Sequence, residues 1–219
     1  AQKRFVSSAL FSFIRFSFFL FHSILLLKIT KKSVSMKIVS GMARGIVLQA
    51  PSGLEVRPTS VRARCALMDS LRDFTGLRVA DLCAGSGGIG LETASRGAAE
   101  VLFVEANFHH CSFIKSNIEK VRKTGAQFES EVVCSDILDC GNYISRLPEP
   151  DLIFADPPYA ESAGLFTALW EKPEFREWAR NARVVWELPD SPGAAGAFLN
   201  YTIPERAGRV RRLGSALFF

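Results

Sequence analysis

The sequence predicts a doubly wound α/β fold built around a mostly parallel sheet. Short apolar runs without polar alternation recur along the chain, as is typical of strands that are buried on both faces. Segments of helical character separate these runs, and such alternation indicates parallel strands. Two extended segments near the C-terminus, 198–203 and 215–219, predict a closing hairpin. We therefore expect a mixed sheet with an antiparallel edge strand.

Ahead of the first strand, extended pieces at 37–39 and 45–49 are interrupted by glycines. A loop that contains proline and glycine follows them. Thr59 or Ser60 can then cap a helix that ends near Gly76, because a hydroxyl accepts hydrogen bonds from the first N–H groups of a helix.

The repeating part of the chain follows. Apolar runs in chain order are predicted as buried strands: 77–83, 101–106, 132–138, 151–159 and 182–188. The segments between them are predicted as helices: 89–97, 110–125, 139–147 and 162–180. Gly125 stops the second of these helices, since glycine is a typical residue after the last helical turn. The strand at 151–159 runs directly into two prolines, which end it.

The net charge of +5 does not describe the globular part of the chain. Residues 1–35 hold six basic residues and no acid, which leaves 21 basic against 22 acidic residues over 36–219. Within that nearly neutral remainder, five basic residues stand against one acid at 36–64, and four arginines gather at 206–212. Two basic clusters on a neutral body favour a nucleic-acid partner, with a solvated basic surface as the alternative.

Residues 1–35 differ from the rest in composition, with seven of the 18 phenylalanines of the protein. The longest uncharged run, 16–27, is short for a membrane span. We interpret this segment as sequence upstream of a natural start at Met36, with a targeting or membrane segment as the alternative. We expect a single domain over 36–219 and no stable membrane association.

The five cysteines are scattered and odd in number, without C-x-x-C spacing or a histidine pair at ligand spacing. A disulfide framework and a metal site are therefore both disfavoured. Such a chain suits the reducing cytoplasm.

A glycine-rich stretch, G-S-G-G-I-G at 85–90, joins the first predicted strand to a helix. Gly85 and Gly87 let the backbone approach a ligand closely, and the helix start supplies unpaired N–H groups. Glu105 follows Gly85 by 20 residues, at the end of the second strand, where an acid can bind ribose hydroxyls. This pattern fits NAD and other adenosine cofactors equally well. Glycines that serve only helix packing are the alternative.

Two aspartates favour a particular adenosine cofactor. Asp81 precedes the glycine turn, where it opposes a pyrophosphate but attracts the ammonium group of S-adenosylmethionine. Asp136, at the end of the third strand, can accept a hydrogen bond from an adenine amino group. A simple turn-forming role for Asp136 is equally compatible with the sequence.

The tetrapeptide Asp156-Pro157-Pro158-Tyr159 follows the fourth strand, at the sheet edge where open α/β folds bind ligands. An exocyclic amine of a base is a poor nucleophile, because its lone pair is delocalised into the ring. The Asp156 carboxylate and the Pro157 carbonyl can hold its two N–H groups, and proline keeps that carbonyl rigid. Tyr159 offers a face for stacking the base. A proline-rich strand exit is the alternative.

These motifs, read together, resemble the RsmD-type 16S rRNA guanine-N2 methyltransferases. The resemblance rests on RVADLCAGSGGIGLETASRGAAEVLFVEAN and DLIFADPPY, and also on GMARG, RPTSVRAR and RRLGSALFF. It implies a class I, Rossmann-like methyltransferase fold with seven strands, S-adenosyl-L-methionine as cofactor, and a substrate within the small ribosomal subunit or its assembly intermediate. The sequence departs from the family pattern at Val61, Cys65 and Cys83.

The resemblance also implies roles for individual residues. Cofactor-binding residues are Asp81, Ala84, Gly85, Ser86, Gly87, Gly88, Glu105 and Asp136. Catalytic residues are Asp156, Pro157, Pro158 and Tyr159. RNA-binding residues, within a basic extension at 36–76, are Arg44, Arg57, Arg62 and Arg64.

Three other functions stay open at this point. Adenine-N6 methyltransferases share the D-P-P-Y motif, so that motif alone does not select guanine. An NAD-dependent oxidoreductase and a non-catalytic RNA-binding module are further alternatives. After the sheet is built, 36–219 leaves no room for a separate DNA-recognition domain, which favours RNA recognised through the basic clusters. We expect a cytoplasmic monomer.

Overall fold

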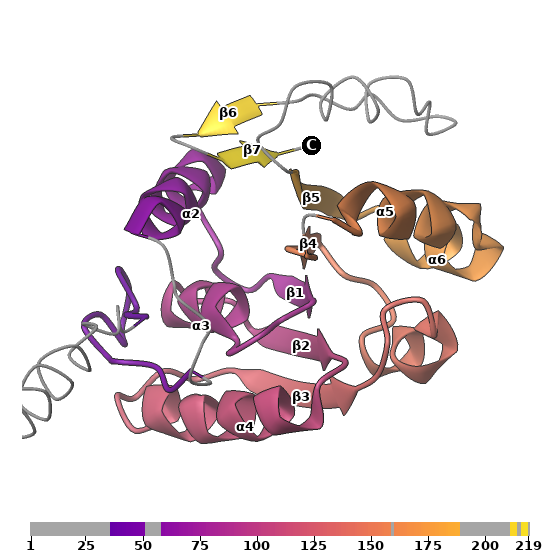
Figure 1. Ribbon diagram of the computed structural model, residues 1–219. Coiled ribbons are helices and arrows are strands. Elements are labelled where there is room, and N and C mark those ends of the chain that lie inside the picture. Colours follow the sequence, from indigo (N-terminus) through magenta and orange to yellow (C-terminus); the bar gives the residue numbers. More distant parts are fainter. Residues whose placement is uncertain (1–35, 51–57, 159, 189–210, 214–215, 219) are drawn as a thin grey trace, which may run out of the picture. The chain divides into compact units, whose positions relative to one another are not determined.

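The computed structural model describes residues 36–50, 58–158, 160–188, 211–213 and 216–218. Its strands form one mixed sheet in the order β3-β2-β1-β4-β5-β7-β6 (Figure 1). Their bounds are β1 (Arg78–Leu82), β2 (Glu100–Glu105), β3 (Glu129–Cys134), β4 (Leu152–Ala155), β5 (Arg183–Leu188), β6 (Arg211–Leu213) and β7 (Ala216–Phe218). Strands β1 to β5 pair in parallel. The predicted doubly wound α/β fold is therefore confirmed.

The last two strands form the predicted hairpin, with one change. Strand β7 pairs antiparallel with both β5 and β6, and β6 lies at the edge of the sheet. The first arm of this hairpin is β6, at 211–213, whereas the prediction placed it at 198–203, which lies outside the described residues.

Helices cover both faces of the sheet. They are α2 (Pro58–Leu71), α3 (Gly88–Ser95), α4 (Phe108–Arg122), α5 (Ser162–Glu171) and α6 (Pro173–Ala179), with two 3-10 turns, η1 (Cys140–Asn142) and η2 (Ile144–Arg146). Alternate residues of each buried strand enter two separate clusters, so that Val79 packs with α2, α3 and α4, while Ala80 packs with α5 and α6. This alternation explains why the buried strands read as continuous apolar runs.

Three predicted boundaries were wrong for identifiable reasons. Strand β3 begins three residues before the predicted 132, because it is the edge strand and its first half is polar and partly exposed. The helix predicted over 162–180 is two helices, since Lys172 is extended and Pro173 starts α6. Helix α2 ends at Leu71, and Arg72 adopts a positive φ of 66°.

The N-terminal extension lies against α3 and α4. Lys37 forms an isolated antiparallel bridge with Val47. On α3, the Glu92 carboxylate accepts hydrogen bonds from the N–H groups of Val39 and Ser40, at 2.8 and 3.0 Å. On α4, the Asn117 side chain bonds Gln49 and donates to the Ser86 carbonyl. The extension is thereby attached to the glycine-rich loop.

No helix within the described part of the chain combines the length and the apolar character needed to cross a membrane.

Candidate functional site

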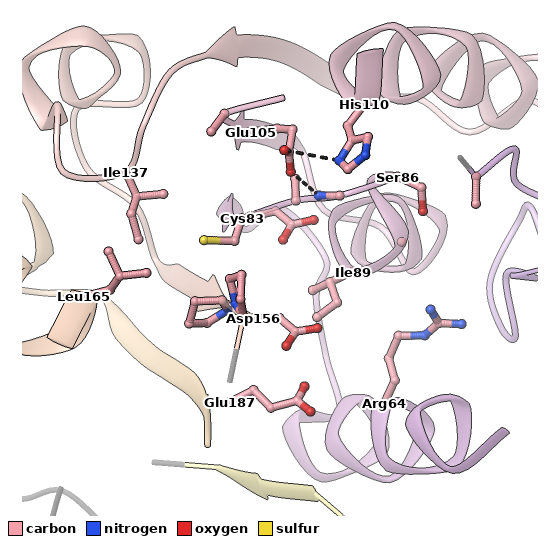
Figure 2. A pocket seen from close by; sticks show the side chains of 18 of the residues that line it. Arg64, Cys83, Ser86, Ile89, Glu105, His110, Ile137, Asp156, Leu165 and Glu187 are labelled. Carbon is pink, nitrogen blue, oxygen red and sulfur yellow. Dashed lines mark hydrogen bonds and ion pairs between the residues drawn. The ribbon is translucent and has the colours of Figure 1, made fainter. Parts of the chain in front are cut away.

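A cavity of about 640 Å³ opens at the carboxyl ends of the parallel strands. Its walls come from the ends of β1, β2, β4 and β5, from the segment after β3, and from helices α2, α3, α4 and α5, as Figure 2 shows for the labelled side chains. It brings together most of the predicted cofactor-binding and catalytic residues: Asp81, Ala84, Gly85, Ser86, Gly88, Glu105, Asp136, Asp156, Pro157 and Pro158. Tyr159 lies outside the described residues. Gly87 is described but is not part of the wall.

The glycines of the loop serve two purposes. A Cβ on Gly87, whose φ is +80°, would lie 3.3 Å from a ring carbon of Phe103, and a Cβ on Gly90 would overlap that ring. These two glycines let α3 pack against β2. Gly85, with φ +58°, has no neighbour within 4 Å of its Cβ position and lines the cavity. The packing interpretation of the motif therefore applies to Gly87 and Gly90, and Gly85 lies where the binding interpretation expects it.

Glu105 ties together the loops that border the cavity. One carboxylate oxygen accepts from the Gly85 N–H at 2.7 Å, and the other accepts from the Asn107 N–H at 2.8 Å. His110 Nδ1 lies 3.3 Å from the second oxygen (Figure 2). Because a carboxylate offers about four acceptor positions, acceptor capacity remains for a ligand hydroxyl.

Asp81 is buried, with 2% of its surface exposed, and one of its oxygens accepts from the Gly90 N–H at 2.8 Å. Burial raises the pKa of Asp81 to about 8, and the nearby Asp156 and Glu105 carboxylates add to the shift. A cation at this place would stabilise the ionised carboxylate and favour loss of the proton, whereas an anion would favour the protonated form.

Asp136 lies two residues beyond β3. Its carboxylate accepts from the Leu138 N–H at 2.8 Å, which closes a local turn. The same residue lines the cavity, so the structure combines the turn-forming role and the ligand-facing position.

Asp156 faces a second carboxyl group that sequence reasoning missed. Enclosure by the protein raises its pKa, and a side-chain hydrogen bond with Glu187 opposes that rise. Glu187 belongs to β5, which pairs with β4. An acid near the end of the strand after β4 was therefore the sequence signal that could have identified it. Both carboxyls line the cavity.

The predicted RNA-binding arginines differ in their surroundings. Arg44 is exposed on the N-terminal extension. Arg57 and the side chain of Arg62 lie outside the described residues. Arg64 is 8% exposed, donates from Nη2 to the Lys37 carbonyl at 3.0 Å and lines the cavity. Its prediction as a surface contact is therefore corrected, since α2 turns this side chain inward.

The described residues contain no group of three histidine, cysteine or acidic side chains that is placed to hold a metal ion.

Comparison with known proteins gives consistent results. The family model described as "Conserved hypothetical protein 95" matches residues 36–195. "Putative rRNA methyltransferase YlbH" of Bacillus subtilis is 33% identical over 129 residues, which cover 58% of this chain and 68% of that protein. "Ribosomal RNA small subunit methyltransferase D" of Haemophilus influenzae is 30% identical over 124 residues, 56% of this chain and 63% of that protein. The matched region thus spans about two thirds of the relatives' own length.

Among solved structures, a hypothetical protein of Thermus thermophilus, TTHA0928, superposes with a TM-score of 0.58 at 29% identity. The superposition covers 83% of this chain and 96% of that one. With the family model matching most of the chain, the chain belongs to the Conserved hypothetical protein 95 family, the RsmD-type family that its motifs resemble.

Proposed function

We propose that this protein is an S-adenosylmethionine-dependent methyltransferase that modifies the exocyclic N2 of a guanine in 16S rRNA of the small ribosomal subunit. The observation that carries the proposal is a single cavity that joins the glycine loop and Glu105 to Asp156 and Pro157. The names of the relatives, which are rRNA methyltransferases, support the choice of substrate.

The charges of the cavity fit this cofactor better than they fit NAD. Its described wall includes six acids: Asp81, Glu105, Asp136, Asp156, Glu161 and Glu187. S-adenosylmethionine carries two positive groups, an ammonium and a sulfonium, which an acidic wall stabilises. The pyrophosphate of NAD would place two negative charges beside the same carboxylates. The acidic wall therefore disfavours the oxidoreductase alternative.

The bound cofactor supplies a methyl group that is activated by its attachment to positively charged sulfur. The protein has to orient the amine and receive its proton. Asp156 can accept one N–H of the amine, and the Pro157 carbonyl can accept the other, which directs the nitrogen lone pair away from the ring. The carboxyl pair of Asp156 and Glu187 can then receive the proton that the methylated nitrogen loses.

The basic extension provides the proposed contact with RNA. Arg44 and Lys37 are exposed there, and Lys37 directly follows the cavity-lining Met36. Such side chains bind phosphate without reading sequence, so specificity would come from the shape of the subunit or its assembly intermediate. We propose that the protein acts as a monomer in the cytoplasm.

Calorimetric titration with S-adenosylhomocysteine and with NAD tests the cofactor class. We expect binding of S-adenosylhomocysteine and no heat of binding from NAD. Binding of NAD alone would overturn the proposal.

The rival adenine-N6 activity is separated by identifying the methylated nucleoside, because N2-methylguanosine and N6-methyladenosine differ in chromatographic mobility and fragmentation.

A further inference from the structure

Arg64 is a buried cation with unused hydrogen-bonding capacity. Its Nη2 donates to the Lys37 carbonyl, while its buried Nε has no hydrogen-bond partner within the described part of the chain. No carboxylate among the described residues lies within ion-pair distance of it. A buried donor without a partner costs stability, so this arginine keeps hydrogen-bonding capacity that the described residues do not use.

The guanidinium lies beside the start of α3. A Cβ built on Gly88, the first residue of that helix, would be 3.1 Å from Arg64 Nη1. Gly87 supplies no side-chain cap for α3, and the Gly90 N–H donates to Asp81. This leaves the N–H groups of Gly88 and Ile89 at the start of the helix for a ligand. Helix N-termini attract anions. Arg64 and the start of α3 therefore face the same part of the cavity, as the labelled Arg64, Ile89 and Ser86 show (Figure 2).

The remaining charges of the wall leave one place for an anionic group. Six acids line the rest of the cavity, and His110 lies beside Glu105. Arg64 is the one arginine in the described wall. Although burial lowers its pKa, a guanidinium keeps its charge in proteins.

We propose that Arg64, together with the N-terminus of α3, binds the α-carboxylate of the methionine part of S-adenosylmethionine. The inference rests on the proposed function and adds the residue that recognises the only anionic group of the cofactor. It fixes the orientation of the ligand, with the carboxylate toward α2, the ammonium near Asp81 and the ribose near Glu105.

The test compares two ligands that differ in the carboxylate alone. S-adenosylhomocysteine carries it, whereas 5′-deoxy-5′-(3-aminopropylthio)adenosine keeps the ammonium and lacks the carboxylate. Both are titrated by calorimetry into the full chain, the Arg64→Met and Arg64→Lys variants, and Arg146→Met as a matched loss of an exposed arginine that pairs with Glu131.

We expect the wild type and Arg146→Met to prefer S-adenosylhomocysteine by about 10- to 100-fold, the usual range for a charge-assisted hydrogen bond. Arg64→Met should lose this preference while binding the carboxylate-free ligand within about threefold of wild type, given the matched volume. Arg64→Lys should retain part of the preference for S-adenosylhomocysteine, because an ammonium keeps the positive charge but lacks the planar set of donors of a guanidinium.

Four results would contradict the inference or the proposed function. An unchanged preference in Arg64→Met would overturn the inference. So would an equal loss of both ligands by a folded variant, since that outcome assigns Arg64 a purely structural role through Lys37. If Arg64→Met does not fold in a thermal melt, the Arg64→Lys comparison decides, and a full wild-type preference there overturns the inference. A wild type that binds neither ligand contradicts the proposed function itself.

Discussion

The two halves of the cavity use their acids differently. In the cofactor half, formed by Asp81, the glycine loop and Glu105, each carboxylate accepts hydrogen bonds from backbone N–H groups. In the substrate half, formed by Asp156, Pro157 and Glu187, the Asp156 carboxyl hydrogen-bonds the Glu187 side chain. The acids of the first half hold the backbone of the loops that border the cavity, whereas the carboxyl pair of the second half joins the ends of two neighbouring strands. Substitutions in the two halves should therefore differ in what they damage.

The largest effect is expected in the substrate half. Asp156→Ala removes an acceptor for the reacting amine, so methyl transfer should fall by at least about 100-fold. Affinity for S-adenosylhomocysteine, measured by calorimetry, should stay within several-fold of wild type. Asp139→Ala, which removes an exposed acid, serves as the control. Near-normal turnover of Asp156→Ala would show that the substrate half does not contain the catalytic group.

In the cofactor half, Glu105→Ala should impair binding and stability together. It leaves the N–H groups of Gly85 and Asn107 without their acceptor, at a cost of about 1–3 kcal/mol in the free energy of unfolding. Cofactor affinity should fall by about tenfold or more, because a loss of about 1.4 kcal/mol in the free energy of binding lowers the affinity by a factor of ten. Chemical denaturation and calorimetry measure the two effects, with the exposed Glu119→Ala as control. If Glu105→Ala lost turnover but kept its cofactor affinity and stability, the two halves would not differ in the role of their acids.

Gly90→Ala separates the packing role of the loop from its binding role. The added methyl overlaps Phe103 and Val101, and such overpacking costs about 1–3 kcal/mol of stability. Gly164→Ala is the matched control: it lies inside α5 with open space at its Cβ position, and should stabilise by up to about 1 kcal/mol. Equal melting temperatures for both variants would contradict the packing assigned to Gly90.

The protonation of Asp81 gives a smaller but specific signal. Its pKa is raised from 3.8 to about 8, so the folded chain keeps this proton between those values while the unfolded chain loses it. The contribution of Asp81 to stability therefore falls as the pH rises through that window. A bound ammonium favours the carboxylate, so ligand binding at neutral pH should release a proton, measured as a dependence of the binding enthalpy on the buffer. In Asp81→Asn the binding enthalpy should no longer depend on the buffer. A wild type that releases no proton on binding would contradict the protonation assigned to Asp81.

Arg44 lies outside both halves and should affect only the contact with RNA. Arg44→Ala should weaken binding to small subunits by a few-fold and reduce the slope of log affinity against log salt by about one. Its affinity for S-adenosylhomocysteine should equal that of wild type. A change in cofactor affinity would contradict the structure, in which Arg44 is not part of the cavity wall.

The cofactor half could be predicted from the sequence because it is local. One strand, one turn and one helix carry Asp81 and the glycines, and Glu105 ends the next strand. Glu187 and Arg64 could not be predicted as parts of the site, because only the pairing of β5 with β4 and the packing of α2 bring them to it. The start of β3 was missed because an edge strand with a partly exposed face does not need an apolar run.

The most direct test of the central claim is methyl transfer from radiolabelled S-adenosylmethionine to purified small ribosomal subunits, followed by digestion and identification of the labelled nucleoside. The proposed function predicts label in N2-methylguanosine with the wild type and at least about 100-fold less with Asp156→Ala. Label in N6-methyladenosine, or no transfer by a folded protein that binds S-adenosylhomocysteine, would contradict it.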